Sequence, residues 1–147
     1  MMAPTTSTTS GDSGELSQPR TILLVEDDEL VRLSTRDALE LLGYHVIAES
    51  NGADALARLR RDDEIDILFT DGVMPSGMSG LVLAREARAL RPGLRILLAS
   101  GHARDGLASE RELAEFTFLA KPYRLQELAA TLRALKPTGS EDGRAGV

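Results

Sequence analysis

The fold is decided in residues 22–29, which read Ile-Leu-Leu-Val-Glu-Asp-Asp-Glu. The first four are apolar, with a β-branched residue at each end, and such a run is typical of a short strand buried on both faces. Four acids follow with no spacer between them. We expect such an abrupt change where a parallel strand ends at the carboxyl edge of a sheet, which is the edge where these sheets bind ligands.

Outward from this stretch, apolar runs of strand length alternate with segments of helical periodicity. Strands are predicted at 21–25, 45–48, 65–70, 95–99 and 116–119, and helices at about 30–42, 53–61, 81–90, 107–114 and 125–135. The periodicity places Val31 and Leu125 on inward faces, and Gly43 is expected to end the first helix. Five strands alternating with five helices predict an α/β fold, with a doubly wound, five-stranded parallel sheet.

The composition restricts the class of protein. The chain has 147 residues, a net charge of −6 and no cysteine, so disulfides and thiolate metal sites are excluded. Nucleic-acid binders usually carry a basic face, which this acidic chain does not suggest. No apolar run approaches the roughly 20 residues of a membrane span, and the N-terminus lacks the regions of a secretory signal. We therefore expect a cytoplasmic protein that binds neither nucleic acid nor a membrane.

The apolar periodicity is confined to the middle of the chain. Residues 1–20 are rich in Ser, Thr, Pro and Gly and are predicted to form a disordered N-terminal tail. Residues 136–147 are similar and are predicted to form a flexible C-terminal tail, which leaves residues 21–135 as the folded domain. Because no output domain is expected after Leu135, any signal would leave the domain through protein contacts.

Polar side chains follow four of the predicted strands. Glu26 and Asp27 follow the first, Asp71 the third, Ser100 the fourth and Lys121 the fifth. Three carboxylates packed together need a raised pKa or a cation, and Mg²⁺ suits oxygen ligands. A lysine and a serine can bind phosphoryl oxygens, and a remaining carboxylate can act as a nucleophile. The set predicts an aspartyl phosphate site.

These residues lie in motifs that resemble the receiver domain of bacterial two-component response regulators. The matching motifs, which extend over about residues 21–135, are 22–29, Leu68-Phe69-Thr70-Asp71, Met74-Pro75, Ser79-Gly80, 97–101 and Lys121-Pro122. The resemblance implies the flavodoxin-like receiver fold, and the short chain suggests a single-domain response regulator. The loop at 76–80 is one residue longer than the usual form and is similar to loops in receivers attached to hybrid sensor kinases.

The resemblance assigns the metal and phosphoryl roles residue by residue. Asp71 would be the phospho-acceptor. Glu26 and Asp27 would form the acidic pair, with Asp27 a direct Mg²⁺ ligand, and the carbonyl of Val73 would supply another. Lys121 would pair with the phosphoryl group, and the peptide bond between Lys121 and Pro122 is typically cis in this family.

The resemblance also assigns a switch. Ser100 would reach for the phosphoryl group, and the ring of Phe118 would reorient with it. Asp28 and Glu29, beyond the acidic pair, would begin the first helix. His102 would lie beside the path of the hydrolytic water, although an exposed loop histidine is the simpler interpretation, and Phe118 could instead be a plain core residue.

As a receiver, the chain would take a phosphoryl group from a sensor histidine kinase or a histidine phosphotransfer protein. It would act on an unknown downstream protein as a signalling switch and not as a turnover enzyme, and the resemblance allows a homodimer. The alternatives are a phosphate relay or sink, an unphosphorylated interaction module, and a phosphohydrolase. The last needs a second acid two residues beyond Asp71, where the chain has Val73.

Overall fold

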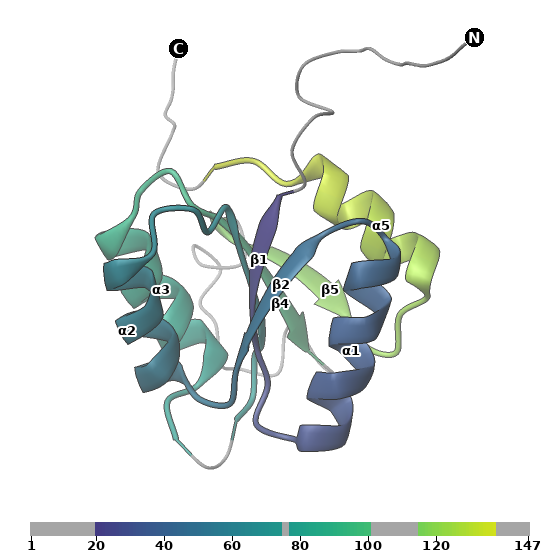
Figure 1. Cartoon of the computed structure of the whole chain (residues 1–147), viewed down its shortest axis with the longest axis horizontal. Helices are drawn as coiled ribbons and strands as arrows, with labels where there is room; N and C mark the ends of the chain where they lie inside the picture. Colours follow the sequence, from purple (N-terminus) through teal and green to yellow (C-terminus); the bar gives the residue numbers. More distant parts are fainter. Residues whose placement is uncertain (1–19, 75–76, 101–114, 138–147) are drawn as a thin grey trace, which may run out of the picture.

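The computed structural model describes residues 20–74, 77–100 and 115–137 of the chain (Figure 1). The elements alternate along the chain, and the labels keep the gap left by the predicted helix at 107–114, which lies outside the described residues. In order they are β1 (Thr21–Val25), α1 (Glu29–Leu41), β2 (His45–Glu49), α2 (Gly52–Arg61), β3 (Ile67–Asp71), α3 (Gly80–Leu90), β4 (Arg95–Ser100), β5 (Thr117–Ala120) and α5 (Leu125–Ala134).

The five strands form one parallel sheet in the order β2-β1-β3-β4-β5. This confirms the predicted fold class. The chain leaves β1 toward β2 on one side and then returns to β3 on the other, so the order reverses between β1 and β3. In open α/β sheets, that switch point is where ligands bind, at the carboxyl ends of the strands.

Two apolar cores lie on opposite faces of the sheet, because successive strand residues point to opposite sides. In β1, Leu23 and Val25 pack toward α2 and α3, whereas Ile22 and Leu24 pack toward α1 and α5. Figure 1 shows α2 and α3 on one side of the sheet and α1 and α5 on the other. Both cores are mainly aliphatic. Their packing fixes the strands, and therefore the carboxyl ends of the strands, relative to one another.

The ends of α1 explain how the acidic run turns into a helix. The Asp28 side chain accepts a hydrogen bond from the Val31 backbone N–H at 3.1 Å and caps the helix, and Glu29 in the first turn favours the helix dipole. Gly43 has a φ of 100°, which is a left-handed conformation that glycine adopts without strain. Gly43 therefore ends α1 as predicted.

The boundaries of β3 differ from the prediction. Ile65 is buried, but the strand begins at Ile67. Asp66 pairs instead with the start of β1, where its carboxylate accepts a hydrogen bond from the Thr21 N–H at 2.9 Å. The Arg91 guanidinium donates to the carbonyl of Ile65 at 2.6 Å. These side-chain contacts hold the approach to β3, and an apolar pattern cannot reveal them.

Not every residue predicted to face inward lies in the cores. Val31 and Leu125 are 41% and 43% exposed. Each lies in the first turn of its helix, beyond the part that packs on the sheet. The predicted tails lie almost wholly outside the described residues, apart from Arg20, Lys136 and Pro137, the last of which bridges Arg95. Within the described ranges, no helix has the length and apolar character to cross a membrane.

Candidate functional site

The carboxyl ends of β1 and β3 bring three acids together. Val25 pairs with Thr70 in the sheet register, so Glu26 and Asp71, the next residues along each chain segment, meet at the same edge. One carboxylate oxygen from each of Glu26, Asp27 and Asp71 lies within 4.8 Å of the other two. The structure therefore gathers the three acids that the sequence predicted would converge.

Glu26 is the buried member of this group, with 6% of its surface exposed. Burial raises the pKa of its carboxyl, the hydrogen bond from the Asp28 N–H opposes that rise, and the charge of Asp71 adds to it. That N–H lies 3.0 Å from a Glu26 carboxylate oxygen. The Arg32 guanidinium, however, donates to the Glu26 carbonyl and not to its carboxylate, at 2.8 Å.

Asp71 lies between the other two acids and the ammonium group of Lys121. The Lys121 ammonium is 3.3 Å from Asp71 Oδ1, and the Asp71 side chain is 13% exposed. The Val73 N–H donates a long hydrogen bond of 3.4 Å to the same oxygen. The Asp71 carboxylate is thus largely covered, oriented on one side by two donors, and adjacent to two other carboxylates.

Lys121 and Ser100 are placed by neighbouring strands. Ser100 pairs with Ala120 in the register of β4 and β5, and the Lys121 N–H donates to the Ser100 carbonyl at 2.9 Å. The Lys121–Pro122 peptide bond is cis, as the resemblance implied. The buried Ser100 side chain faces Gly72, where a Cβ would lie 3.9 Å from the Ser100 hydroxyl oxygen. Both polar groups therefore flank the segment that carries Asp71.

The acids are chemically suited to a hard divalent cation. Three carboxylates at short range, one of them buried, carry more negative charge than one half-exposed lysine offsets. Oxygen donors of this kind are the ligands that Mg²⁺ takes in proteins, where it also keeps several waters. The residues present thus fit Mg²⁺. The predicted ligand role of the Val73 carbonyl stays a prediction.

The structure bears differently on the remaining residues to which the resemblance gave a role. Phe118 is half-buried and packs against the core beneath α2 and α3, beside the buried Phe116. The plain core interpretation and the switch interpretation are both consistent with that position. His102 lies outside the described residues. Asp28 and Glu29 begin α1, as the resemblance implied.

The family model of the response regulator receiver domain matches residues 22–133. The chain belongs to the response regulator receiver family. This receiver is 40% identical over 108 residues to the response regulator receiver protein CpdR of Brucella abortus, covering 73% of the chain and 88% of CpdR. It is 38% identical over 123 residues to the sensor kinase CckA of the same organism, covering 82% of the chain.

Solved receivers share the fold. The receiver domain of the hybrid histidine kinase CckA superposes with a TM-score of 0.62 at 30% identity, covering 77% of this chain and 95% of that one. TrrA of Thermotoga maritima, solved in complex with Mg²⁺-BeF, gives 0.68 at 27% identity, covering 78% and 96%. The receiver spans 13% of the length of sensor kinase CckA. The matches establish a receiver of two-component signalling, a family of phospho-accepting switches.

Sequence reasoning missed two residues that the structure places at the site. Gly80 begins α3 directly against the Asp71 backbone, and its N–H donates to the Gly72 carbonyl at 3.1 Å. Tyr123 follows Lys121-Pro122 and lines a small cavity together with Glu26, Asp71 and Lys121. Gly80 was identified only as part of a motif. An aromatic residue so close to a predicted phosphoryl-binding lysine was a signal that could have identified Tyr123.

Proposed function

We propose that the receiver accepts a phosphoryl group on Asp71 from the phosphohistidine of a sensor histidine kinase or a histidine phosphotransfer protein. The observation that carries this proposal is the contact of the Asp71 carboxylate with Lys121 at 3.3 Å, inside a cluster of three acids. A nucleophilic carboxylate needs an adjacent positive charge to accept a phosphoryl group. Family membership supports the same chemistry.

In the proposed reaction, an Asp71 oxygen attacks the phosphorus of phosphohistidine in line with the N–P bond. The new O–P bond forms as the N–P bond breaks, and the imidazole leaves with the electron pair and takes up a proton. Lys121 offsets the charge on the transferred group, and the hydroxyl of Ser100 donates to one of its oxygens. Phosphoryl transfer depends mainly on positioning and charge neutralisation, which these side chains supply.

Mg²⁺ would be held by Asp27, Asp71 and the Val73 carbonyl, with Glu26 as the buried partner of the acidic pair. A bound Mg²⁺ would supply the positive charge that offsets the carboxylate and phosphoryl oxygens. The solved TrrA complex with Mg²⁺-BeF supports such a site in a related receiver. In the present chain, the burial of the Glu26 carboxylate and the nearby charge of Asp71 are the local reasons to expect a cation.

Phosphorylation would bias a two-state surface. A phosphoryl group adds a charge of about −1.5 to −2 and strong acceptors, which would draw Ser100 and Lys121 inward. The ring of Phe118, on β5, would then reorient together with the Ser100 hydroxyl. The surface of β5, α5 and the predicted helix at 107–114 would change, and a downstream protein would read that change.

Intact mass spectrometry after incubation with acetyl phosphate and Mg²⁺ tests the phospho-acceptor. We expect one phosphoryl adduct on the native protein, no adduct on Asp71→Asn, and loss of the adduct in EDTA. Asp71→Asn is nearly isosteric, so circular dichroism should report an unchanged fold. An adduct of equal yield on Asp71→Asn would contradict the assignment of this residue.

The second candidate function is a phosphate relay. The 38% identity to the sensor kinase CckA favours this candidate. A relay would return the phosphoryl group from Asp71 to the histidine of a phosphotransfer protein. Mixing the phosphorylated receiver with such a protein and following both masses separates the alternatives. Transfer to histidine faster than hydrolysis supports the relay, whereas slow loss to inorganic phosphate supports a switch that signals by contact.

A further inference from the structure

Arg32 in α1 reaches back to the end of β1. Its backbone N–H donates to the Asp28 carbonyl at 2.8 Å, at the start of the helix, and its Nη1 donates to the Glu26 carbonyl at 2.8 Å. A helical side chain leans toward the N-terminus of its helix, so Arg32 can cover the turn that precedes α1. The arginine therefore ties the start of α1 to the strand end that carries the acids.

The Glu26 carbonyl lies where the hydrogen-bonded ladder between β1 and β2 stops. The Glu26 N–H still donates to the Glu49 carbonyl at 3.2 Å, but β2 ends at Glu49 and Asn51 already caps α2. Among the described residues, no backbone N–H donates to the Glu26 carbonyl, and a carbonyl in a buried residue needs a partner. The Arg32 guanidinium thus takes the place of the next donor in the ladder.

This carbonyl belongs to the peptide unit that leads into Asp27. Because a peptide unit is planar, holding the Glu26 oxygen also fixes the directions of the Asp27 N–H and Cα. The following peptide unit is held as well, since the Asp28 N–H donates to the Glu26 carboxylate at 3.0 Å. Both peptide units that flank Asp27 are therefore restrained by a side chain, the first by Arg32 and the second by Glu26.

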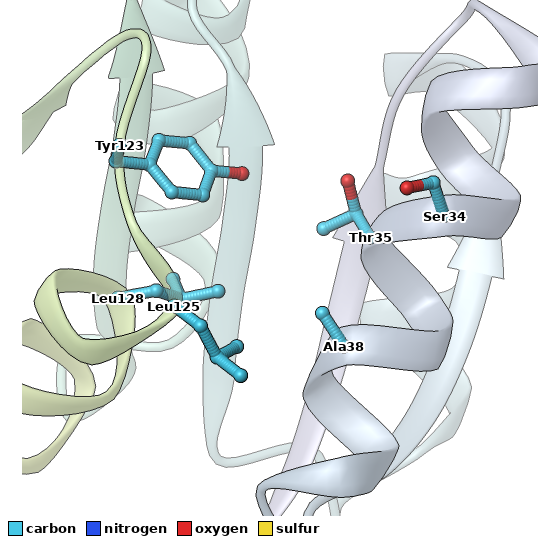
Figure 2. Close-up of a pocket in the computed structure, with 6 residues that line it drawn as sticks. All are labelled: Ser34, Thr35, Ala38, Tyr123, Leu125 and Leu128. Carbon is cyan, nitrogen blue, oxygen red and sulfur yellow. The ribbon is translucent and has the colours of Figure 1, made fainter.

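Helix α1 is incompletely packed on the side of α5. A pocket of about 200 Å³ lies between the two helices, where Thr35 of α1 lies across from Tyr123 and Leu125 (Figure 2). Thr35 and Tyr123 also line the small cavity beside the acids. Side chains of α5 thus leave space beside this part of α1, and the Arg32 hydrogen bond is a direct restraint between the helix and the strand end.

Arg32 binds the acidic turn through the main chain. Its Nη1 donates to the Glu26 carbonyl, whereas the Glu26 carboxylate accepts from the Asp28 N–H and the Asp71 carboxylate contacts Lys121. A guanidinium bound to a carboxylate would compete with a cation for its oxygens, and this carbonyl contact does not. The positive charge of Arg32, taken alone, repels a cation. Orientation by Arg32 and repulsion by its charge therefore affect metal binding with opposite signs.

We propose that Arg32 is a positioning residue for Asp27, whose carboxylate it holds at the proposed Mg²⁺ site through the peptide unit that follows Glu26. The inference rests on the proposed function, because it concerns the metal site that would serve phosphoryl transfer to Asp71. It also makes a statement about metal binding itself, which is measurable without any phosphoryl donor.

Calorimetric titration of the metal-free protein with Mg²⁺, at fixed ionic strength, tests the positioning role. Arg32→Met removes the donor and should weaken Mg²⁺ binding about three- to thirtyfold. If Arg32 acted only through its charge, the same variant would bind Mg²⁺ more tightly. Arg32→Gln, a second neutral variant with a shorter side chain, should weaken binding in the same way, and circular dichroism checks that both variants keep the native fold.

Arg36→Met is the matched control variant. Arg36 lies one turn further along α1 and pairs with Glu40 at 3.5 Å, so its replacement removes the same charge from the same helix without touching the Glu26 carbonyl. The Mg²⁺ affinity of Arg36→Met should not fall below that of the native protein. In an Asp27→Asn background, Arg32→Met should have no further effect on Mg²⁺ binding, because Arg32 acts through Asp27.

The Mg²⁺ dependence of phosphorylation by acetyl phosphate separates metal positioning from the chemical step. Arg32→Met should raise the Mg²⁺ concentration at half-maximal rate by the same factor as the dissociation constant, and should leave the rate at saturating Mg²⁺ near the native value. A lower rate at saturation with an unchanged half-maximal concentration would contradict the inference, because Arg32 would then act on the chemical step.

The outcomes distinguish this inference from the proposed function. Absence of a phosphoryl adduct on the native protein, together with weaker Mg²⁺ binding in Arg32→Met, would overturn the proposed function and support the positioning role. Native phosphorylation with an equal or higher Mg²⁺ affinity in Arg32→Met would overturn the positioning role alone. An equal loss of affinity in Arg36→Met would also overturn it, since the effect would then belong to the helix and not to the contact with Glu26.

Discussion

Glu26 combines burial with negative charge at the edge of the sheet. The residue is 6% exposed and its carboxylate accepts a hydrogen bond from the Asp28 N–H, yet burial and the charge of Asp71 raise its pKa. Such a group destabilises the metal-free protein when it is ionised and becomes useful when a cation is bound. An acid at a position where its charge destabilises the metal-free fold indicates that the function requires that charge.

We therefore predict that Glu26→Gln stabilises the metal-free protein at pH 7 and raises its melting temperature by a few degrees. A carboxyl whose folded pKa is raised contributes stability when protonated, and loses that contribution as the pH rises above the ordinary value near 4.5. The advantage of Glu26→Gln should thus be present at pH 7 and vanish toward pH 4. Thermal melts in EDTA across this range measure it. An advantage that grows toward acidic pH would have the wrong sign.

At this scale, the sequence predicted the acids, the lysine and the serine because each immediately follows an apolar strand. It could not predict which acid is buried, since Glu26 and Asp27 are neighbours of the same chemical type. Only the fold decides that Glu26 is covered while Asp27 is half-exposed. Nor could it predict that Thr35 and Tyr123, which are 88 positions apart in sequence, line the same two cavities.

The start of α3 is the element that fixes the Asp71 backbone. Ser79 caps this helix by accepting the Val82 N–H at 3.2 Å, and Gly80 then passes directly over β3. A Cβ on Gly80 would lie 2.8 Å from the Asp71 carbonyl carbon and Gly72 Cα, and closer still to the Asp71 carbonyl oxygen. A helix can begin this close to a strand only where the residue has no side chain.

We predict that Gly80→Ala destabilises the receiver by about 1–3 kcal/mol, because the overlap with backbone atoms must be relieved by moving the helix or the strand. The same shift should slow phosphorylation of Asp71. Gly77→Ala is the matched control in the same loop, since a Cβ there meets nothing within 4 Å. Urea denaturation and the acetyl phosphate assay measure the two effects. Equal stability of the two variants would contradict the close approach.

The elements show where periodicity succeeds and where it fails. It located the core of each described helix and strand because burial follows the helical and strand repeats. It failed for Val31 and Leu125, which match the helical repeat but lie in first turns beyond the sheet. It also began β3 two residues early, since Ile65 packs in the core beneath α2 and α3 although it precedes the strand. An apolar residue in the sequence indicates burial, but it does not indicate whether the buried residue belongs to a strand or to a loop.

For the whole molecule, the two cores converge on one edge. Leu23 and Val25 face α2 and α3, Leu24 faces α1 and α5, and the chain then emerges at Glu26. The site is thus supported by both layers, and its acids cannot move apart without disturbing the packing of β1 and β3. Repulsion among the acids therefore lowers the free energy of unfolding of the whole domain.

It follows that Mg²⁺ should stabilise the whole domain and not only a local loop. A ligand that binds the folded state alone stabilises it by about 2.7 kcal/mol when its concentration is 100 times the dissociation constant. We predict that saturating Mg²⁺ raises the melting temperature of the native protein, with little effect on Asp27→Asn or Asp71→Asn. Sodium chloride at matched ionic strength separates specific binding from screening. If the sodium salt raised the melting temperature as much as Mg²⁺, the three acids would be a screened surface cluster and not a magnesium site.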